Sequence, residues 1–104
     1  MIIATSSTVA EQKIVKTLGL VKGSTIRARH VGKDIVAGLK NLVGGEIEEY
    51  TKLMAEAREQ AMDRMKTHAE EMGANAVVDV RFSTSYIMGM ASEILVYGTA
   101  VIVQ

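Results

Sequence analysis

Apolar residues recur every three or four positions through residues 46–72, a stretch that contains neither glycine nor proline. This spacing places them along one face of an α-helix and leaves the charged residues between them on the solvated face. The apolar positions are Ile47, Tyr50, Met54, Ala57, Ala61, Met65, Ala69 and Met72. Gly73 follows directly and is suited to the left-handed residue that ends a helix. The pattern predicts one helix about 40 Å long at about 1.5 Å per residue, longer than a compact core of this size requires.

Residues 14–29 show a different pattern, rich in β-branched side chains. They predict one long strand, bent or bulged at Gly19 and Gly23, because an isolated glycine in a strand often marks a bulge. The alternative is a hairpin with its turn at residues 20–23. Closer to the N-terminus, the apolar residues 2–4 predict a brief strand.

The C-terminal part of the chain carries two further strand patterns. Residues 76–83 alternate between two faces and predict a half-buried strand, on which Asp79 and Arg81 share a face and are expected to pair with each other or with the next strand. Residues 83–92 predict a loop or an irregular edge. Residues 94–103 are apolar on both faces, which predicts a central strand with cover on both sides.

Between these patterns, residues 34–42 predict a short helix, capped by Asp34 and ended by Gly44 and Gly45. The elements together predict an α+β fold in a single domain spanning residues 1–104. A small, mostly antiparallel sheet would pack on the long helix, with the short helix in addition.

The predicted central strand needs cover on two faces, and one long helix covers only one. Either the short helix or another copy of the chain must cover the second face. We therefore expect a homo-oligomer. The alternative is a monomer whose sheet wraps around the helix.

The composition excludes several classes of partner and site. Twelve Lys and Arg residues balance twelve Asp and Glu residues, so neither nucleic acid nor an anionic membrane is expected as a partner. The absence of cysteine excludes disulfides, zinc–thiolate sites and a thiol nucleophile. The N-terminus lacks the features of a signal peptide, and no apolar run approaches the roughly 20 residues of a membrane span. A cytoplasmic protein is the expectation.

The candidate metal ligands are two histidines and a few neighbours. His68 and Glu71 are three residues apart on the long helix, a spacing that places ligands side by side. His30 follows a predicted strand, and a subunit contact that brought His30, His68 and Glu71 together would offer a site for a divalent metal. The alternative is an ordinary hydrogen-bonded role for each histidine. Met88 and Met90 resemble a thioether pair for Cu(I), although a flexible apolar contact between subunits explains them better.

No motif in the sequence pairs a nucleophile with a base, and none of the serines lies in a Gly-x-Ser-x-Gly elbow. We therefore predict no catalytic residues and a protein that is not an enzyme. Were it an enzyme, a site shared between subunits would be expected at His30, Asp34, Asn41 and Glu46.

Two segments carry a specific resemblance to a known family: DIVAGLKNLVGGE at residues 34–46 and GANAVV at residues 73–78. The other matching positions are Tyr50, Ala57, Arg58, residues 80–82 and residues 97–101. Over essentially its whole length the chain is similar to the YbjQ-like proteins, an uncharacterised bacterial and archaeal family often labelled heavy-metal-binding. The resemblance implies a dodecin-like subunit, with strands around one long helix, assembled as a ring-shaped pentamer. It implies no established reaction.

Dodecin binds flavin by stacking it on an aromatic platform, but this chain has no tryptophan. Tyr50, Tyr86, Tyr97 and Phe82 would replace such a platform poorly, so no flavin is expected. The sequence predicts a non-enzymatic homo-oligomer that binds a small ligand or a metal, and the resemblance implies that this oligomer is a ring. The alternative is a scaffold or accessory protein with no ligand site of its own.

Overall fold

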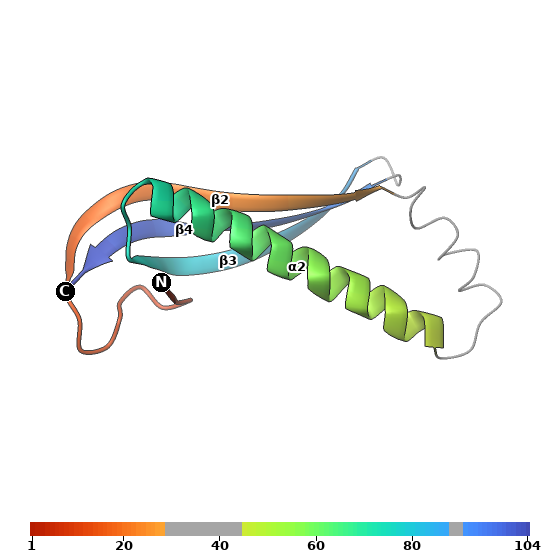
Figure 1. Cartoon of the computed structure of the whole chain (residues 1–104), viewed down its shortest axis with the longest axis horizontal. Helices are drawn as coiled ribbons and strands as arrows, with labels where there is room; N and C mark the ends of the chain where they lie inside the picture. The colour runs from red at the N-terminus through yellow and green to blue at the C-terminus, as the bar shows by residue number, and fades with distance from the viewer. Residues whose placement is uncertain (29–44, 88–90) are drawn as a thin grey trace.

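The computed structural model describes residues 1–28, 45–87 and 91–104. Within them, four strands and a long helix follow one another as β1 (Ile2–Ile3), β2 (Ile14–Ala28), α2 (Gly45–Glu71), β3 (Ala76–Ile87) and β4 (Ala91–Val103). The strands form one sheet in the order β1-β3-β4-β2, and α2 lies across one of its faces (Figure 1). Only β1 and β3 are parallel. The predicted α+β class is confirmed, whereas the predicted short helix over residues 34–42 lies outside the described residues.

The long β2 strand is continuous, so the single-strand prediction is confirmed and the hairpin alternative is wrong. Its pairing with β4 shifts register near Gly19, where φ is +132°, in agreement with the predicted bulge. At Gly23 the register is regular, and the bulge predicted there is wrong. Gly23 instead permits close approach of α2, because a Cβ atom would lie within 2.5 Å of the Ala61 carbonyl oxygen and the Met65 nitrogen.

Strands β3 and β4 extend further than the sequence pattern indicated. Pairing between them continues from Ser83 opposite Leu95 to Ile87 opposite Ala91. The loop or irregular edge predicted over residues 83–92 is therefore wrong for residues 83–87 and 91–92, which pair in regular register, and residues 88–90 lie outside the described residues. Thr, Tyr and Ile in this segment favour strands, and pairing with β4 outweighs the polar character of the serines. The central position predicted for the last strand is confirmed, since β4 lies between β3 and β2.

A bulge interrupts β3 between Val78 and Arg81, and Asp79 at its centre has a φ of +54°. The bulge shifts the side-chain alternation by one residue, so Val77 and Val80 both pack in the cluster beneath α2. The strict alternation predicted for residues 76–83 is wrong for this reason.

The N-terminal segment satisfies the backbone groups that the bulge releases. The Asp79 amide donates to the Ser6 carbonyl at 3.0 Å, and the Ser7 hydroxyl donates to the Asp79 carboxylate at 2.9 Å. Arg81 donates from Nη1 to the Thr5 carbonyl at 2.9 Å. The expected pairing of Asp79 and Arg81 with each other or with the next strand is therefore wrong, because both side chains bind this segment.

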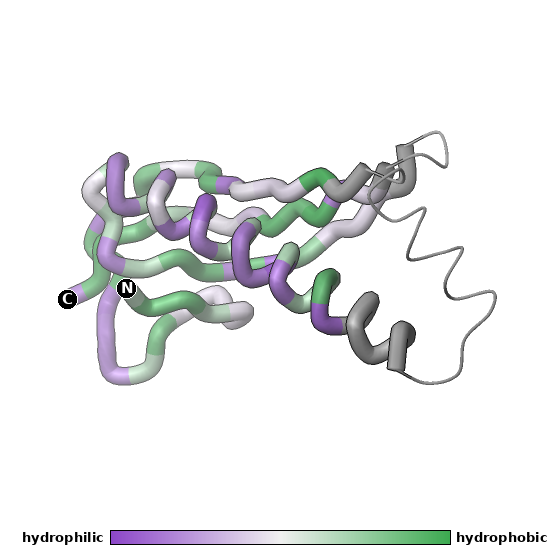
Figure 2. The backbone as a smooth tube through the Cα atoms, turned by 45° about the vertical axis from the view of Figure 1, so that its right-hand side comes forward, coloured by the Kyte–Doolittle hydropathy of each residue, from purple (hydrophilic) through white to green (hydrophobic). Residues whose placement is uncertain are grey.

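The main core lies between α2 and the sheet. The helix contributes a buried stripe of mostly small side chains, and β2, β3 and β4 contribute valine, isoleucine and alanine; its fully or nearly fully buried members are Val21, Ala57, Ala61, Met65, Ala69, Val77, Val80, Ile94, Val96 and Ala100. Figure 2 shows the apolar stretches of the strands beneath the helix. The predicted apolar helix face is thus confirmed where its side chains are described. A smaller cluster on the opposite face packs Val9 and Ile14 against Val78 and Val101.

The molecule is elongated. Its Cα radius of gyration is 17.0 Å and its longest extent is 54 Å, whereas a compact chain of this length has a radius of about 13 Å. In Figure 1 the C-terminal half of α2 lies on the sheet, whereas its N-terminal half diverges from the strands. One end of the helix is therefore left without cover by the sheet.

Asn75 fastens the start of β3 to the end of β4. Its amide Nδ2 donates to the Val103 carbonyl at 2.9 Å, and its Oδ1 accepts from the Val103 amide at 2.8 Å. We expect Asn75→Ala to lower the free energy of unfolding by about 1–2 kcal/mol, because two backbone groups lose their partner. Thermal denaturation followed by circular dichroism measures this loss. Gln104→Ala, at an exposed neighbour, serves as the control, and an equal loss in both variants would contradict this role.

Candidate functional site

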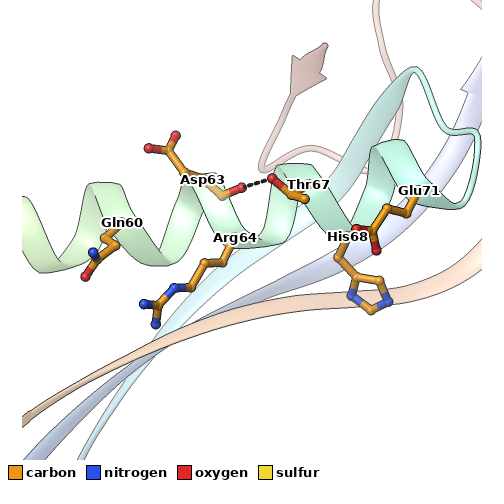
Figure 3. A pocket seen from close by; sticks show the side chains of 6 residues that line it. All are labelled: Gln60, Asp63, Arg64, Thr67, His68 and Glu71. Carbon is orange, nitrogen blue, oxygen red and sulfur yellow. Dashed lines mark hydrogen bonds between the residues drawn. The ribbon is translucent and has the colours of Figure 1, made fainter.

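An open groove of about 380 Å³ runs along the second half of α2 (Figure 3). Its lining side chains all come from the helix and are polar or charged: Gln60, Asp63, Arg64, Thr67, His68 and Glu71. The groove includes both predicted metal ligands for which side chains are described, His68 and Glu71. This is the arrangement that their spacing predicted, since residues three apart share one side of a helix.

Arg64 and His68 reach from the groove to the outer edge of β2. Arg64 donates from Nη1 to the Ser24 carbonyl at 2.5 Å, and the Lys22 amide donates to Nδ1 of His68 at 3.3 Å. Strand β2 is the outermost strand on its side of the sheet, so its outward backbone groups have no neighbouring strand within the described sheet. These two side chains therefore satisfy part of an open edge, a common way to protect such edges.

Thr67, Asp63 and Glu71 also line the groove. The Thr67 hydroxyl donates to the Asp63 carbonyl one turn earlier, at 3.0 Å, a bond that occupies the hydroxyl within the helix. Asp63 and Glu71 are exposed carboxylates on either side of Arg64. The groove is thus of mixed charge and shows no concentration of one sign.

The arrangement does not fit a metal at His68. A metal-bound histidine usually uses one ring nitrogen for the metal and donates a proton from the other. Here Nδ1 accepts the Lys22 amide, so the neutral ring carries its proton on Nε2. A metal on Nε2 would move this proton to Nδ1, where it would face the N–H of Lys22, a second donor. A metal on Nδ1 would replace the hydrogen bond from the Lys22 amide. Across the described part of the chain, no three His, Asp or Glu side chains gather as a metal site requires.

The other candidate residues are divided between described and undescribed parts of the chain. His30, Asp34, Asn41, Met88 and Met90 all lie outside the described residues. Glu46 lies in the first turn of α2. Because His30 lies outside the described residues, the structure does not test the three-residue site of His30, His68 and Glu71, which stays a prediction.

Phe82 and Tyr97, the two candidate aromatic residues whose side chains are described, do not form one surface. Phe82 pairs with Val96, whose side chain belongs to the core beneath α2, and Tyr97 pairs with Arg81 on the other face of the sheet. Paired residues in neighbouring strands share a face, so Phe82 and Tyr97 lie on opposite sides. Within one subunit these two rings cannot stack on the same ligand.

Sequence reasoning did not single out Arg64, and it interpreted Gly23 as a bend or bulge, not as a contact with the helix. The available signal was the four-residue spacing of Arg64 and His68, which places both on one side of the helix. That spacing does not reveal which strand lies beside them.

Comparisons with known proteins give a consistent family. The family model described as "Putative heavy-metal-binding", of the YbjQ type, matches residues 1–104. A UPF0145 protein of Dehalococcoides mccartyi is 61% identical over the full length of both chains. A UPF0145 protein of Methanosarcina acetivorans is 60% identical over 97% of this chain and 95% of its own.

A solved structure gives independent support for the fold. A protein of unknown function from Pediococcus pentosaceus, assigned to the DUF74 family, superimposes with a TM-score of 0.66 and covers 100% of this chain and 98% of its own. At 16% sequence identity this likeness concerns the fold alone. Among the described residues, no helix combines the length and the apolar character needed to cross a membrane.

Proposed function

The chain belongs to the YbjQ-like family of UPF0145 proteins, and on this premise we propose that it is the subunit of a ring-shaped homo-oligomer, a pentamer, that binds a small ligand or a metal and is not an enzyme. The single observation that carries the proposal is the sheet face opposite α2. This face carries exposed apolar side chains, and a second copy of the chain offers an equally apolar surface to cover them.

The sheet face opposite α2 is covered only in part by the chain itself. The N-terminal segment packs Val9 over the end of β4 that contains Val101. Farther along the sheet, Leu20 is 64% exposed, Ile26 is 56% exposed and Tyr97 is 38% exposed. The pairing register places these side chains on the face away from α2. Burying them against another subunit would stabilise the assembly by about 25 cal/mol per Å² of apolar surface.

The N-terminal half of α2 supports the same proposal. A helix within a protein gains most of its stability from the packing of its apolar face. Of the 27 residues of α2, only the C-terminal half lies on the sheet (Figure 1). A neighbouring subunit that packed on the N-terminal half would supply the missing contact.

The oligomer is tested by native mass spectrometry and light scattering of the purified protein at micromolar concentration. We expect a mass five times the 11.2 kDa of one chain. A mass equal to one chain at this concentration would overturn the proposal, and a closed ring of another size would overturn the pentamer alone.

Leu20→Glu combined with Ile26→Glu tests the surface itself. Burying two carboxylates in an apolar contact costs several kcal/mol, so we expect the dissociation constant of the assembly to rise about hundredfold or more. Analytical ultracentrifugation measures it. Gln12→Glu adds a negative charge at an exposed position of the N-terminal segment and is expected to leave the mass unchanged. An intact assembly in the double variant would show that this face is not the contact.

Ligand binding separates the proposed function from its alternative, a scaffold without a ligand site. Native mass spectra are recorded on the protein as purified, and again after addition of zinc or copper. A stoichiometric addition per subunit or per ring supports a binding assembly. A ring that stays bare under all these conditions supports the scaffold, and visible absorbance in the flavin bands would contradict the prediction that no flavin binds.

A further inference from the structure

We propose that Arg64 and His68, through their hydrogen bonds to Ser24 and Lys22, form a clamp that covers the outer edge of β2. His68 takes part as the tautomer that accepts at Nδ1 and carries its proton on Nε2, so neither ring nitrogen has a free lone pair for a metal. His68 is thus a positioning residue, and any metal that the protein binds is held by other side chains. The inference goes beyond the proposed function, because it concerns one subunit and holds whatever the size of the assembly.

The spacings of the helix and the strand match at the clamp. Arg64 and His68 are four residues apart, about 6 Å along a helix axis. Their partners Ser24 and Lys22 are two residues apart, about 7 Å along a strand. The order is reversed, since the later helix residue bonds the earlier strand residue. Two side chains one turn apart can therefore reach two successive outward backbone positions of β2 without distortion.

Gly23 lies between the two bonded positions and lets the helix come close enough. A side chain there would meet the backbone of α2 at Ala61 and Met65, and the Cβ of Arg64 would be 2.9 Å from its first atom. The glycine contact and the two hydrogen bonds thus act on the same three residues of β2. Residues 22–24 of β2 are therefore a specific contact site for α2.

The donor and acceptor pattern fixes the form of His68. The backbone amide of Lys22 can only donate, so Nδ1 must accept, and Nε2 carries the single proton of the neutral ring. Metal binding at either nitrogen would cost this bond, for the reasons given above. The clamp also occupies the amide of Lys22 and the carbonyl of Ser24, so another strand cannot add to β2 at these two positions.

Two substitutions separate the clamp from a metal site. In His68→Asn, the side-chain oxygen can take the place of Nδ1 as acceptor, while the position of Nε2 is lost. In His68→Ala both are lost. Amide hydrogen exchange of Lys22 is measured in each variant, and zinc uptake is measured by native mass spectrometry.

We expect the exchange rate of the Lys22 amide to rise roughly five- to tenfold in His68→Ala, the consequence of losing one hydrogen bond, and to stay within roughly twofold of the wild type in His68→Asn. Zinc uptake, whatever its value in the wild type, is expected to be equal in all three proteins. Loss of bound zinc in both variants would overturn the inference, and so would an unchanged Lys22 exchange rate in His68→Ala.

Nitrogen NMR of the histidine rings tests the tautomer directly in the wild-type protein. The signal assigned to His68, by its absence in His68→Asn, is expected to show the proton on Nε2 in the neutral ring. A proton on Nδ1 would overturn the inference. The oligomer mass of the same samples is recorded in parallel, so failure of the clamp and failure of the proposed assembly are distinguished.

Discussion

Replacing Gly23 with alanine is expected to lower the free energy of unfolding by about 3 kcal/mol. The added methyl group would lie within 2.5 Å of the Ala61 carbonyl oxygen and the Met65 nitrogen, and both are backbone atoms of a helix. A flexible side chain could move aside, but these atoms move only if α2 as a whole shifts away from β2. Overpacking of this kind typically costs 1–3 kcal/mol, and rigid neighbours place Gly23 at the upper end.

Urea denaturation followed by circular dichroism measures this effect, with an expected drop in the midpoint of about 1 M or more. Ser24→Ala is the matched control. It changes the next residue of the strand, on the other face of the sheet, and leaves the carbonyl that Arg64 contacts in place. We expect the control to stay within about 0.5 kcal/mol of the wild type. A Gly23→Ala protein with the wild-type midpoint would mean that the helix does not rest on this glycine.

Met65→Ala is expected to have the second large effect, a loss of about 2–5 kcal/mol. Met65 is fully buried at the centre of the main core and is among its largest enclosed side chains. Its removal would leave a cavity between α2 and the sheet, and the small alanines at positions 61 and 69 beside it on the helix cannot fill the space.

Met62→Ala provides the comparison for Met65, because Met62 is only partly buried at the margin of the same core. Thermal unfolding of both variants should be compared at one protein concentration, since association would add to the apparent stability. We expect Met62→Ala to lose less than half as much stability as Met65→Ala. Equal losses would contradict the placement of Met65 at the centre of the core.

The long periodic segments were predicted well because their pattern alone determines their structure. The helix over residues 46–72 is found at Gly45–Glu71, and Gly73 after it has the predicted left-handed conformation, with φ of +86°. The apolar pattern of residues 94–103 likewise gave a central strand, because a strand that is apolar on both sides must have neighbours. In each case one periodicity extends over ten or more residues.

The features that sequence reasoning missed depend on contacts between distant parts of the chain. The bulge at Asp79 is completed by Ser6 and Ser7, more than seventy residues earlier. Gly23 gave the signal of a bulge, although the reason for the glycine is a helix that comes close to it. Local pattern cannot distinguish a glycine required by its own φ angle from one required by a neighbour.

For the candidate site, too, local spacing was predicted correctly and the contact with another element was missed. The spacing of His68 and Glu71 correctly placed both on one side of α2, in the same groove. Whether a histidine nitrogen donates, accepts or binds a metal depends on the atom opposite it, here the Lys22 amide. That atom belongs to another element and has no signature in the helix sequence.

The strand order has a consequence for synthesis of the protein. Strand β4 pairs with both β2 and β3, yet it follows both of them in the chain. Until β4 has been translated, β2 has no neighbouring strand in the described sheet and β3 can pair only with the two residues of β1. The apolar sides of β2 and α2 therefore stay exposed in the nascent chain. Pairing between β2 and β4, which are separated in the chain by α2 and β3, is slow. We therefore expect the nascent chain to stay protease-sensitive while β4 is inside the exit tunnel, and to fold in one step once β4 is free.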